Sequence, residues 1–158
     1  MRGGIWDNCR MILLFQKNNK SIFARLIRFW TRGPYNHVEI RIIDEQGHWW
    51  QLNADTIEGV VWRPADANYP SDVWDAVTLS EGAADFEEVA KFAAQEKGCG
   101  YDWVGILFAQ ILPLRREHQK KWFCSELVVA AMQECWYPQV LRKRPCALSP
   151  NSLWRHLH

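Results

Sequence analysis

The spacing of apolar residues changes halfway along the chain, and this change restricts the fold more than any other feature of the sequence. Up to residue 80, short runs rich in β-branched and aromatic residues are separated by turn residues. Beyond that point the apolar residues recur at helical spacing. Because the expected strands come early in the chain and the expected helices late, the sequence predicts an α+β fold with an antiparallel sheet packed against helices. The chain has 158 residues, a length that suits one core, so we expect a single domain over residues 1–158.

The strand-rich half is expected to contain a tight hairpin at residues 45–47, which read Glu-Gln-Gly. In a three-residue loop Gly47 takes the left-handed position, and Asp44 then pairs with His48. Residues whose numbers sum to 92 face each other in that register. A two-residue turn would shift the pairing by one residue, and residues 51, 53 and 55 would then lie on the opposite face of the sheet from residue 37. The expected strands cover residues 9–17, 35–44, 48–55, 58–64 and 74–80.

The second half is expected to be helical, and its capping residues mark where helices begin and end. Gly98 and Pro113 each follow an apolar run as a stop signal. Ser149 followed by Pro150 marks the start of the last helix. The expected helices of this half cover residues 85–98, 101–113, 124–136 and 149–157.

A further helix, residues 19–33, interrupts the strand-rich half. Its apolar residues recur at helical spacing with arginines opposite, and Ser21 or Asn19 can cap its start. A basic amphipathic helix of this kind either packs on a sheet or lies on a membrane surface. We expect packing on the sheet.

Charge and cysteine content argue against several classes of function. Lys and Arg total 19 and Asp and Glu 18, and this balance gives no argument for a nucleic-acid partner. No apolar run approaches the length of a transmembrane segment, although contact with a membrane surface stays open. Five cysteines without a CxxC pair argue against a disulfide framework and a zinc cluster, and no cofactor or metal is expected.

The location expected from the sequence is the reducing cytoplasm. Residues 11–17 are too short for the apolar core of a signal peptide and lack a following cleavage site. The cysteine pattern suits a reduced compartment. A protein delivered by phage lysis or by a specialised secretion system would show the same features.

Cys124 stands at the start of an expected apolar helix, where a basic stretch ends. It shares a helical stripe with Leu127 and Val128 and therefore faces the interior, as an ordinary buried cysteine does. The helix start also suits a nucleophile, because free N–H groups and the helix dipole lower the pKa of a thiol and can hold an oxyanion. Both interpretations stay open. As a nucleophile, Cys124 should be the fastest-reacting thiol of the chain.

A cysteine nucleophile needs a base, and His37 is the candidate because it alone among the five histidines lies within an apolar β-run. A buried histidine on a strand also serves structural roles. In the predicted register His37 lies opposite Asp55, with Asn53 on its diagonal. Gln51 shares this face. The amide oxygen of Asn53 can accept a hydrogen bond from the imidazole, as in Cys-His-Asn sites.

Five segments of the chain resemble one family. They read SIFARLIRFWTRGPYNHVEI, WWQLNADTIEGVV, GYDWVGIL, WFCSELVVAAM and LSPNSLW. They are similar to the circularly permuted papain-fold, NlpC-like proteins, which include the YiiX-like amidases or peptidases and, more distantly, the lecithin:retinol acyltransferase relatives. The similarity covers most of residues 10–155 and implies a permuted papain-like fold, with the nucleophilic cysteine at a helix N-terminus.

The resemblance also implies a role for each matching residue. In that family a histidine comes first, a polar orienting residue second, and a cysteine at a helix start third. Cys124 is then the nucleophile, His37 the base and Asn53 the orienting residue. The chain departs from the pattern at two positions, because the family usually has a small residue in place of Glu39 and often an acid in place of Asn53.

The sequence therefore predicts a cysteine amidase or peptidase that works through an acyl-enzyme. The resemblance implies peptidoglycan stem peptides as substrates, and Tyr35 and Tyr101 are the candidate substrate-binding residues. One alternative is a lipid or thioester acyltransferase or hydrolase of the lecithin:retinol acyltransferase type, supported by the basic helix at residues 19–33. A non-catalytic binding module is the other.

Overall fold

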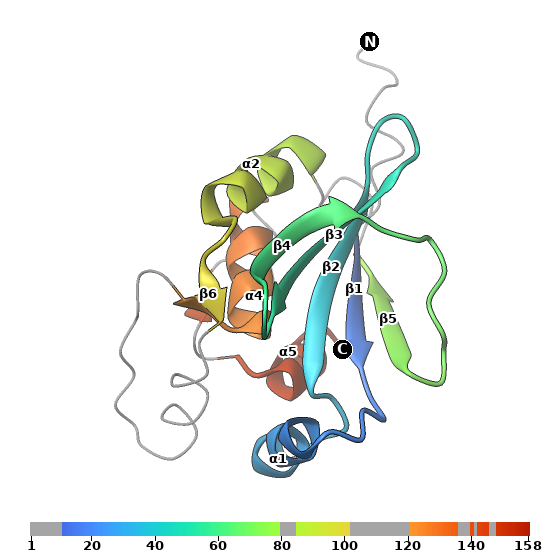
Figure 1. The fold of residues 1–158 in the computed structure, drawn as a ribbon, viewed down its shortest axis with the longest axis vertical. Coiled ribbons are helices and arrows are strands. Elements are labelled where there is room, and N and C mark those ends of the chain that lie inside the picture. Colours follow the sequence, from blue (N-terminus) through green and yellow to red (C-terminus); the bar gives the residue numbers. More distant parts are fainter. Residues whose placement is uncertain (1–10, 80–84, 102–120, 136–139, 141, 146–147) are drawn as a thin grey trace.

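Five antiparallel strands form the main sheet, in the order β4-β3-β2-β1-β5 (Figure 1). The computed structural model describes residues 11–79, 85–101, 121–135, 140, 142–145 and 148–158. The strands are β1 (Met11–Gln16), β2 (His37–Ile43), β3 (Trp49–Asp55), β4 (Gly59–Pro64) and β5 (Trp74–Thr78). The predicted α+β class and the antiparallel sheet are confirmed.

The β2–β3 hairpin has the predicted register. Ile40 pairs with Leu52, so the numbers of paired residues sum to 92. The N–H of Asp44 donates to the carbonyl of His48 at 2.9 Å, and the N–H of Gly47 donates to the carbonyl of Asp44 at 3.0 Å. Gly47 has the expected positive φ of 85°. Continued toward the start of β2, this register places His37, the first residue of that strand, opposite the end of β3.

Four helices lie in the described part of the chain: α1 (Ile22–Thr31), α2 (Phe86–Glu96), α4 (Cys124–Glu134) and α5 (Pro150–Leu157). Ser21 and Ser149 are the N-caps of α1 and α5, as predicted, and each hydroxyl accepts a backbone N–H at 3.1 Å. None of these helices is long and apolar enough to cross a membrane. The helix expected over residues 101–113 lies outside the described residues, apart from its first position.

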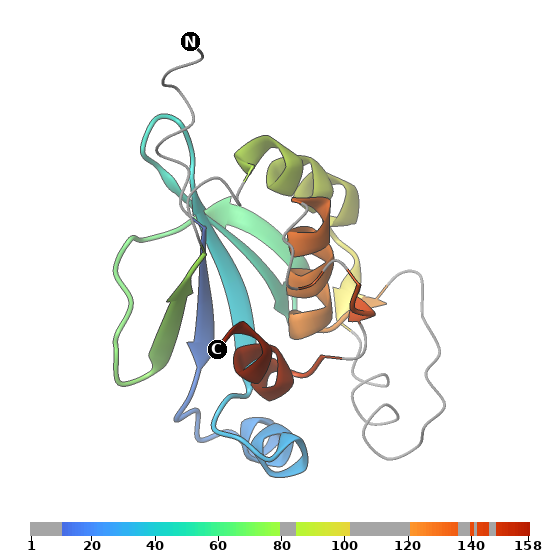
Figure 2. The same cartoon turned by 180° about the vertical axis from the view of Figure 1, so that it is seen from behind.

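Helices α2 and α4 cover one face of the sheet (Figure 2). The buried side chains Val38 and Ile40 of β2 and Leu52 of β3 share a core with Leu127 and Val128 of α4. Burying a Leu or Val side chain contributes about 1.5–3 kcal/mol. Packing therefore holds α4 in place, although its N-cap residue provides no side-chain hydrogen bond.

Helix α1 does not bury its apolar side on the sheet, and this part of the sequence-based prediction is wrong. Ile22 and Phe29 are 73% and 78% exposed. The helix contacts α5 at one end of the sheet instead (Figure 1). The buried residue of α1 is the small Ala24. The periodicity was compatible with either orientation, because spacing alone does not show which side of a helix meets the protein.

Two short strands, β6 (Gly100–Tyr101) and β7 (Lys121–Trp122), pair in parallel beside β4. The N–H of Val60 in β4 donates to the carbonyl of Cys99 at 2.9 Å. The two segments approach so closely at Gly59 that a Cβ there would lie 2.2 Å from the Cys99 oxygen. Gly59 also has a φ of +76°. This glycine contact holds the segment that ends at Tyr101 against the sheet.

We predict that Gly59→Ala destabilises the protein more than Gly47→Ala. Both glycines have positive φ, and a left-handed alanine costs about 1–2 kcal/mol at either position. A Cβ at Gly47 meets no atom within 4 Å, whereas a Cβ at Gly59 overlaps the Cys99 backbone. Overpacking adds about 1–3 kcal/mol. Urea titrations of both variants measure the difference, and equal losses of unfolding free energy would contradict the close approach.

Candidate active site

Cys124 is the first residue of α4, as the sequence predicted, and its side chain is fully buried. The N-cap residue, Phe123, has a side chain that accepts no hydrogen bond from the first turn. The N–H groups of an uncapped helix start are donors for a nearby anion. The thiol is also in contact with the backbone of Val38 and Ser125 and with the side chain of Tyr101.

Burial raises the pKa of the Cys124 thiol to about 11. Hydrogen bonds from the backbone of Val38 and Ser125 and from the Tyr101 side chain act in the opposite direction, but burial outweighs them. At neutral pH the side chain is therefore an uncharged thiol. The pKa is therefore higher than expected for a thiol at a helix start, because a helix start stabilises a thiolate only as far as desolvation allows.

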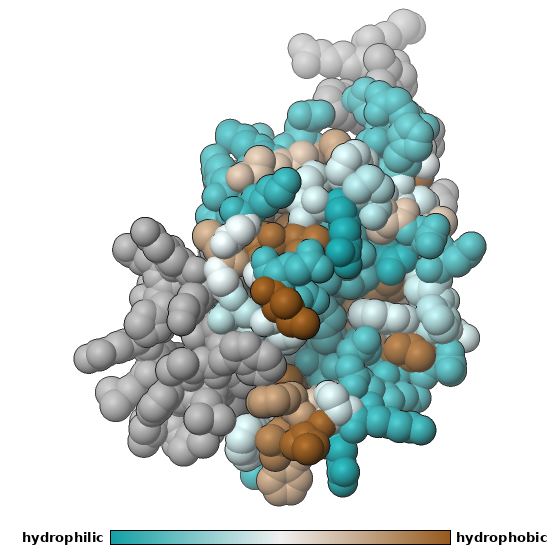
Figure 3. All heavy atoms as spheres, viewed as in Figure 1, coloured by the Kyte–Doolittle hydropathy of each residue, from teal (hydrophilic) through white to brown (hydrophobic). Residues whose placement is uncertain are grey.

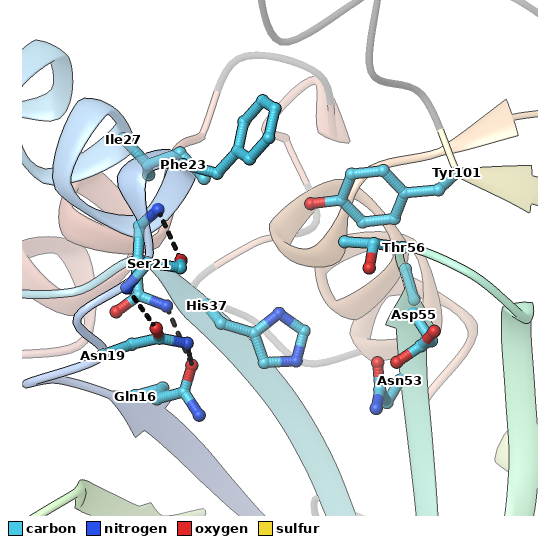
Figure 4. Close-up of a pocket in the computed structure, with 13 residues that line it drawn as sticks. Gln16, Asn19, Ser21, Phe23, Ile27, His37, Asn53, Asp55, Thr56 and Tyr101 are labelled. Atoms are coloured by element: carbon cyan, nitrogen blue, oxygen red, sulfur yellow. Dashed lines mark hydrogen bonds between the residues drawn. The ribbon is translucent and has the colours of Figure 1, made fainter.

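His37 lies beside a cavity of about 260 Å³ at the end of the sheet (Figure 4). Burial lowers the pKa of its imidazole to about 4, although the charge of Asp55 acts to raise it. The imidazole is therefore neutral at pH 7. Its ring also makes an edge contact with Trp74, with 6.2 Å between the centroids. A neutral imidazole in a cavity has a free lone pair and can accept a proton.

The cavity combines a polar and an apolar wall. Figure 4 shows the imidazole of His37 between Phe23 and Ile27 of α1 on one side and the end of β3 on the other. The hydroxyl of Tyr101 points into the same space. The residues that line the cavity are Gln16, Asn19, Ser21, Phe23, Ala24, Ile27, Asn36, His37, Asn53, Ala54, Asp55, Thr56 and Tyr101.

Three residues are candidates to orient His37, and they differ in the hydrogen bonds that their side chains make. Asn53 is buried at the cavity, and its Oδ1 has no hydrogen-bond partner in the described part of the chain. Asp55 lines the cavity and accepts the N–H groups of Ile57 and Glu58 at 2.7 and 3.0 Å. Burial acts to raise the pKa of Asp55, but these hydrogen bonds and the nearby His37 lower it overall.

The Gln51 side chain is hydrogen-bonded to another residue on the same face of the sheet. Its Nε2 donates to Glu39 Oε2 at 3.2 Å. The other oxygen of this carboxylate forms an ion pair with Arg41 at 3.1 Å. Burial raises the pKa of Glu39, and the charge of Arg41 opposes that shift. Glu39, which stands where the resembling family usually has a small residue, directs its carboxylate to Arg41 and Gln51.

The two tyrosines proposed as substrate-binding residues have different positions. Tyr101 lines the cavity and contacts the Cys124 thiol. Tyr35 is buried in the core, where its ring packs against Phe15 and Trp154. Its hydroxyl donates to Asp75 Oδ2 at 2.8 Å. Burial and this hydrogen bond raise the pKa of Tyr35.

Cys124 and His37 are connected through Val38. Among the described residues, no hydrogen bond joins the thiol to the imidazole. The backbone of Val38, the residue after His37, contacts the Cys124 sulfur. Tyr101 provides a second connection, because it contacts the thiol and lines the cavity that contains His37. The structure therefore brings Cys124, Tyr101 and the start of β2 to one place.

Sequence reasoning missed Asn151, which holds the segment leading into His37. Asn151 lies buried in the first turn of α5. Its Oδ1 accepts the N–H of Tyr35 at 2.9 Å, and its Nδ2 donates to the Tyr35 carbonyl at 2.7 Å. A Cβ on Gly33 would overlap this amide. The available signal was an asparagine directly after Pro150, at a helix start that the sequence analysis had identified.

Within the described residues no three His, Cys, Asp or Glu side chains are placed to hold a metal ion. Comparison with models of protein families gives no match, and comparison with curated protein sequences gives none either.

We predict that His37 makes the protein less stable as the pH falls from about 6.5 to about 4. The folded protein holds the imidazole with a pKa of about 4, whereas 6.5 is its ordinary value, so the unfolded chain binds more protons in this interval. The loss at low pH is at most about 3 kcal/mol. Urea titrations across this range should show a shallower pH dependence for His37→Gln than for the wild type. Parallel curves would show that the imidazole is not desolvated.

Proposed function

We propose that the protein is a cysteine-dependent hydrolase that forms an acyl-enzyme on Cys124. The observation that carries this proposal is the placement of the Cys124 thiol at an uncapped helix start, in contact with the backbone beside His37. A buried cysteine with only a packing role has no need of a hydroxyl and backbone donors around its sulfur. The resemblance of the motifs to permuted papain-fold, NlpC-like proteins supports the same reaction.

In the proposed reaction the thiol adds to the carbonyl carbon of the substrate while His37 accepts the thiol proton. The oxyanion that forms is held by N–H groups at the start of α4. His37 then donates the proton to the leaving group as the carbon–heteroatom bond breaks, which leaves a thioester on Cys124. Water attacks the thioester, and the acid product and the free thiol are released.

The protonation states favour general-base catalysis over a preformed ion pair. The thiol has a pKa of about 11 and the imidazole one of about 4, so both are neutral in the resting site. The proton must therefore leave the sulfur during the attack. A substrate carbonyl at the helix start would supply the negative charge that those N–H groups and Tyr101 stabilise.

The polar half of the cavity suits an amide substrate. Asn53 lines that half with an Oδ1 that has no partner in the described part of the chain, and a peptide N–H is a donor that such an acceptor recognises. Peptidoglycan stem peptides are the amide substrates that the resemblance implies.

A second candidate function is the hydrolysis or transfer of a lipid or thioester acyl group. The observation that favours it is the apolar half of the cavity, where Phe23 and Ile27 of α1 form the wall (Figure 4). An acyl chain gains affinity by burial against such side chains. The nucleophile and the base are the same in both candidates. Parallel assays with muropeptides and with phospholipids or acyl thioesters separate them.

We predict that incubation with an activated acyl ester adds one acyl group to Cys124. Mass spectrometry of peptides from the folded protein locates the adduct. Cys124→Ala should lose it, whereas Cys99→Ala and Cys135→Ala should keep it, because neither of these half-buried thiols is the first residue of a helix. His37→Ala should form the adduct about 10²–10⁴-fold more slowly. An adduct on Cys99 or Cys135 alone would refute the assignment of the nucleophile.

We predict that Asn53→Ala lowers turnover more than Asp55→Asn does. The unpartnered Oδ1 of Asn53 is the acceptor available to the imidazole N–H, and losing an orienting group costs up to about 10⁴-fold. Asp55→Asn keeps an oxygen for the turn N–H groups of Ile57 and Glu58 but removes the charge. It should shift the acidic limb of the pH–rate profile downward, because that charge raises the pKa of His37. The reverse ranking would transfer the orienting role to Asp55.

A further inference from the structure

Helix α1 turns its apolar side to solvent. Ile22, Phe23 and Phe29 are 73%, 59% and 78% exposed, and Leu26 is 38% exposed. With about 100° between successive residues, these four side chains and the half-buried Trp30 form one continuous arc. Figure 3 shows this surface as brown and tan atoms at the lower end of the molecule, over α1. An exposed apolar arc of this size marks an interaction surface.

The residues on the opposite side of α1 are small or polar, and this side faces the rest of the protein. Ala24 is buried there. The Arg28 guanidinium donates to Asn36 Oδ1 at 3.0 Å. Asn151 Nδ2 donates to Thr31 Oγ1 at 2.5 Å. These contacts fix the rotation of the helix about its axis and keep the apolar arc pointing outward.

The Lys and Arg residues of α1 and its flanking segments have no acidic neighbours in the sequence. Residues 17–38 contain five basic residues and no acidic residue. Lys20, Arg25 and Arg32 are exposed, and within the described part of the chain they form no ion pair. Arg25 lies at the border of the apolar arc, and Arg32 is the C-cap of the helix. Apolar residues bordered by exposed cations are complementary to the headgroup region of an anionic bilayer.

The arc continues into the cavity. Phe23 belongs to both, and its ring stands at the cavity wall across from Thr56 (Figure 4). Ile57, the next residue on that turn, is 92% exposed. An exposed apolar residue therefore follows Thr56, the cavity residue across from Phe23.

We propose that α1 docks the protein on an anionic membrane surface. Ile22, Leu26 and Phe29 enter the boundary between headgroups and acyl chains, and Arg25 and Arg32 contact the anionic headgroups. The cavity then opens toward the lipid. This surface is independent of the catalytic role of Cys124, so Cys124→Ala should bind membranes as the wild type does.

Vesicle flotation with the full chain tests the proposal. Vesicles of phosphatidylcholine and phosphatidylglycerol should bind the protein, and vesicles of phosphatidylcholine alone should bind it more weakly. Ile22→Ser/Phe29→Ser should weaken binding by about 10-fold or more, because two exposed apolar anchors are lost. Arg25→Glu/Arg32→Glu should abolish the preference for phosphatidylglycerol. Arg142→Glu/Arg144→Glu, which reverses two exposed charges outside α1, is the matched control and should leave binding unchanged.

Three results would overturn the proposal. The first is the absence of vesicle binding by the wild type. The second is equal binding by the wild type and both α1 variants, each shown to be folded by circular dichroism. The third is a concentration-dependent dimer, measured by sedimentation, that both α1 variants disrupt while vesicle binding is absent. That result would assign the α1 surface to a second copy of the chain.

Discussion

The packing of α4 across β2 and β3 is the contact on which the rest of the site depends. Seven residues of α4 are buried, Cys124 among them. This packing brings a helix start against the backbone of Val38 and thereby places a thiol beside the strand that begins with His37. The helix needs no side-chain cap, because burial of its apolar residues holds it in place. The uncapped end is available for chemistry.

The same burial works against the thiolate. Removing Cys124 from water raises the pKa of its thiol to about 11, although the Tyr101 hydroxyl, the two backbone groups of the helix start and the backbone of Val38 favour the anion. Burial likewise lowers the pKa of His37 to about 4. Desolvation thus keeps both groups uncharged at rest. The proposed reaction follows this constraint, since it transfers the proton as the substrate arrives.

Three contacts hold the elements around the cavity in place. The close approach of Gly59 to Cys99 fixes the short strand that carries Tyr101. Asn151 binds both backbone groups of Tyr35 and so fixes the segment that enters β2. The polar contacts of Arg28 with Asn36 set the orientation of α1 at the third wall. The apolar arc that α1 leaves exposed is a consequence of that orientation, and it connects the proposed site to the proposed membrane surface.

The sequence by itself determined the features that depend on near neighbours. Alternation and turn chemistry defined the β2–β3 hairpin, and its register is that of the three-residue loop with Gly47 in the left-handed position. Ser21 and Ser149 marked helix starts, because capping acts over three or four residues. The change from a basic to an apolar stretch marked the helix start at Cys124. Only the tertiary structure decided which way α1 faces, because helical spacing is the same for an inward and an outward apolar arc. Tertiary packing also decided the protonation of Cys124 and His37, since desolvation depends on contacts between residues far apart in the chain.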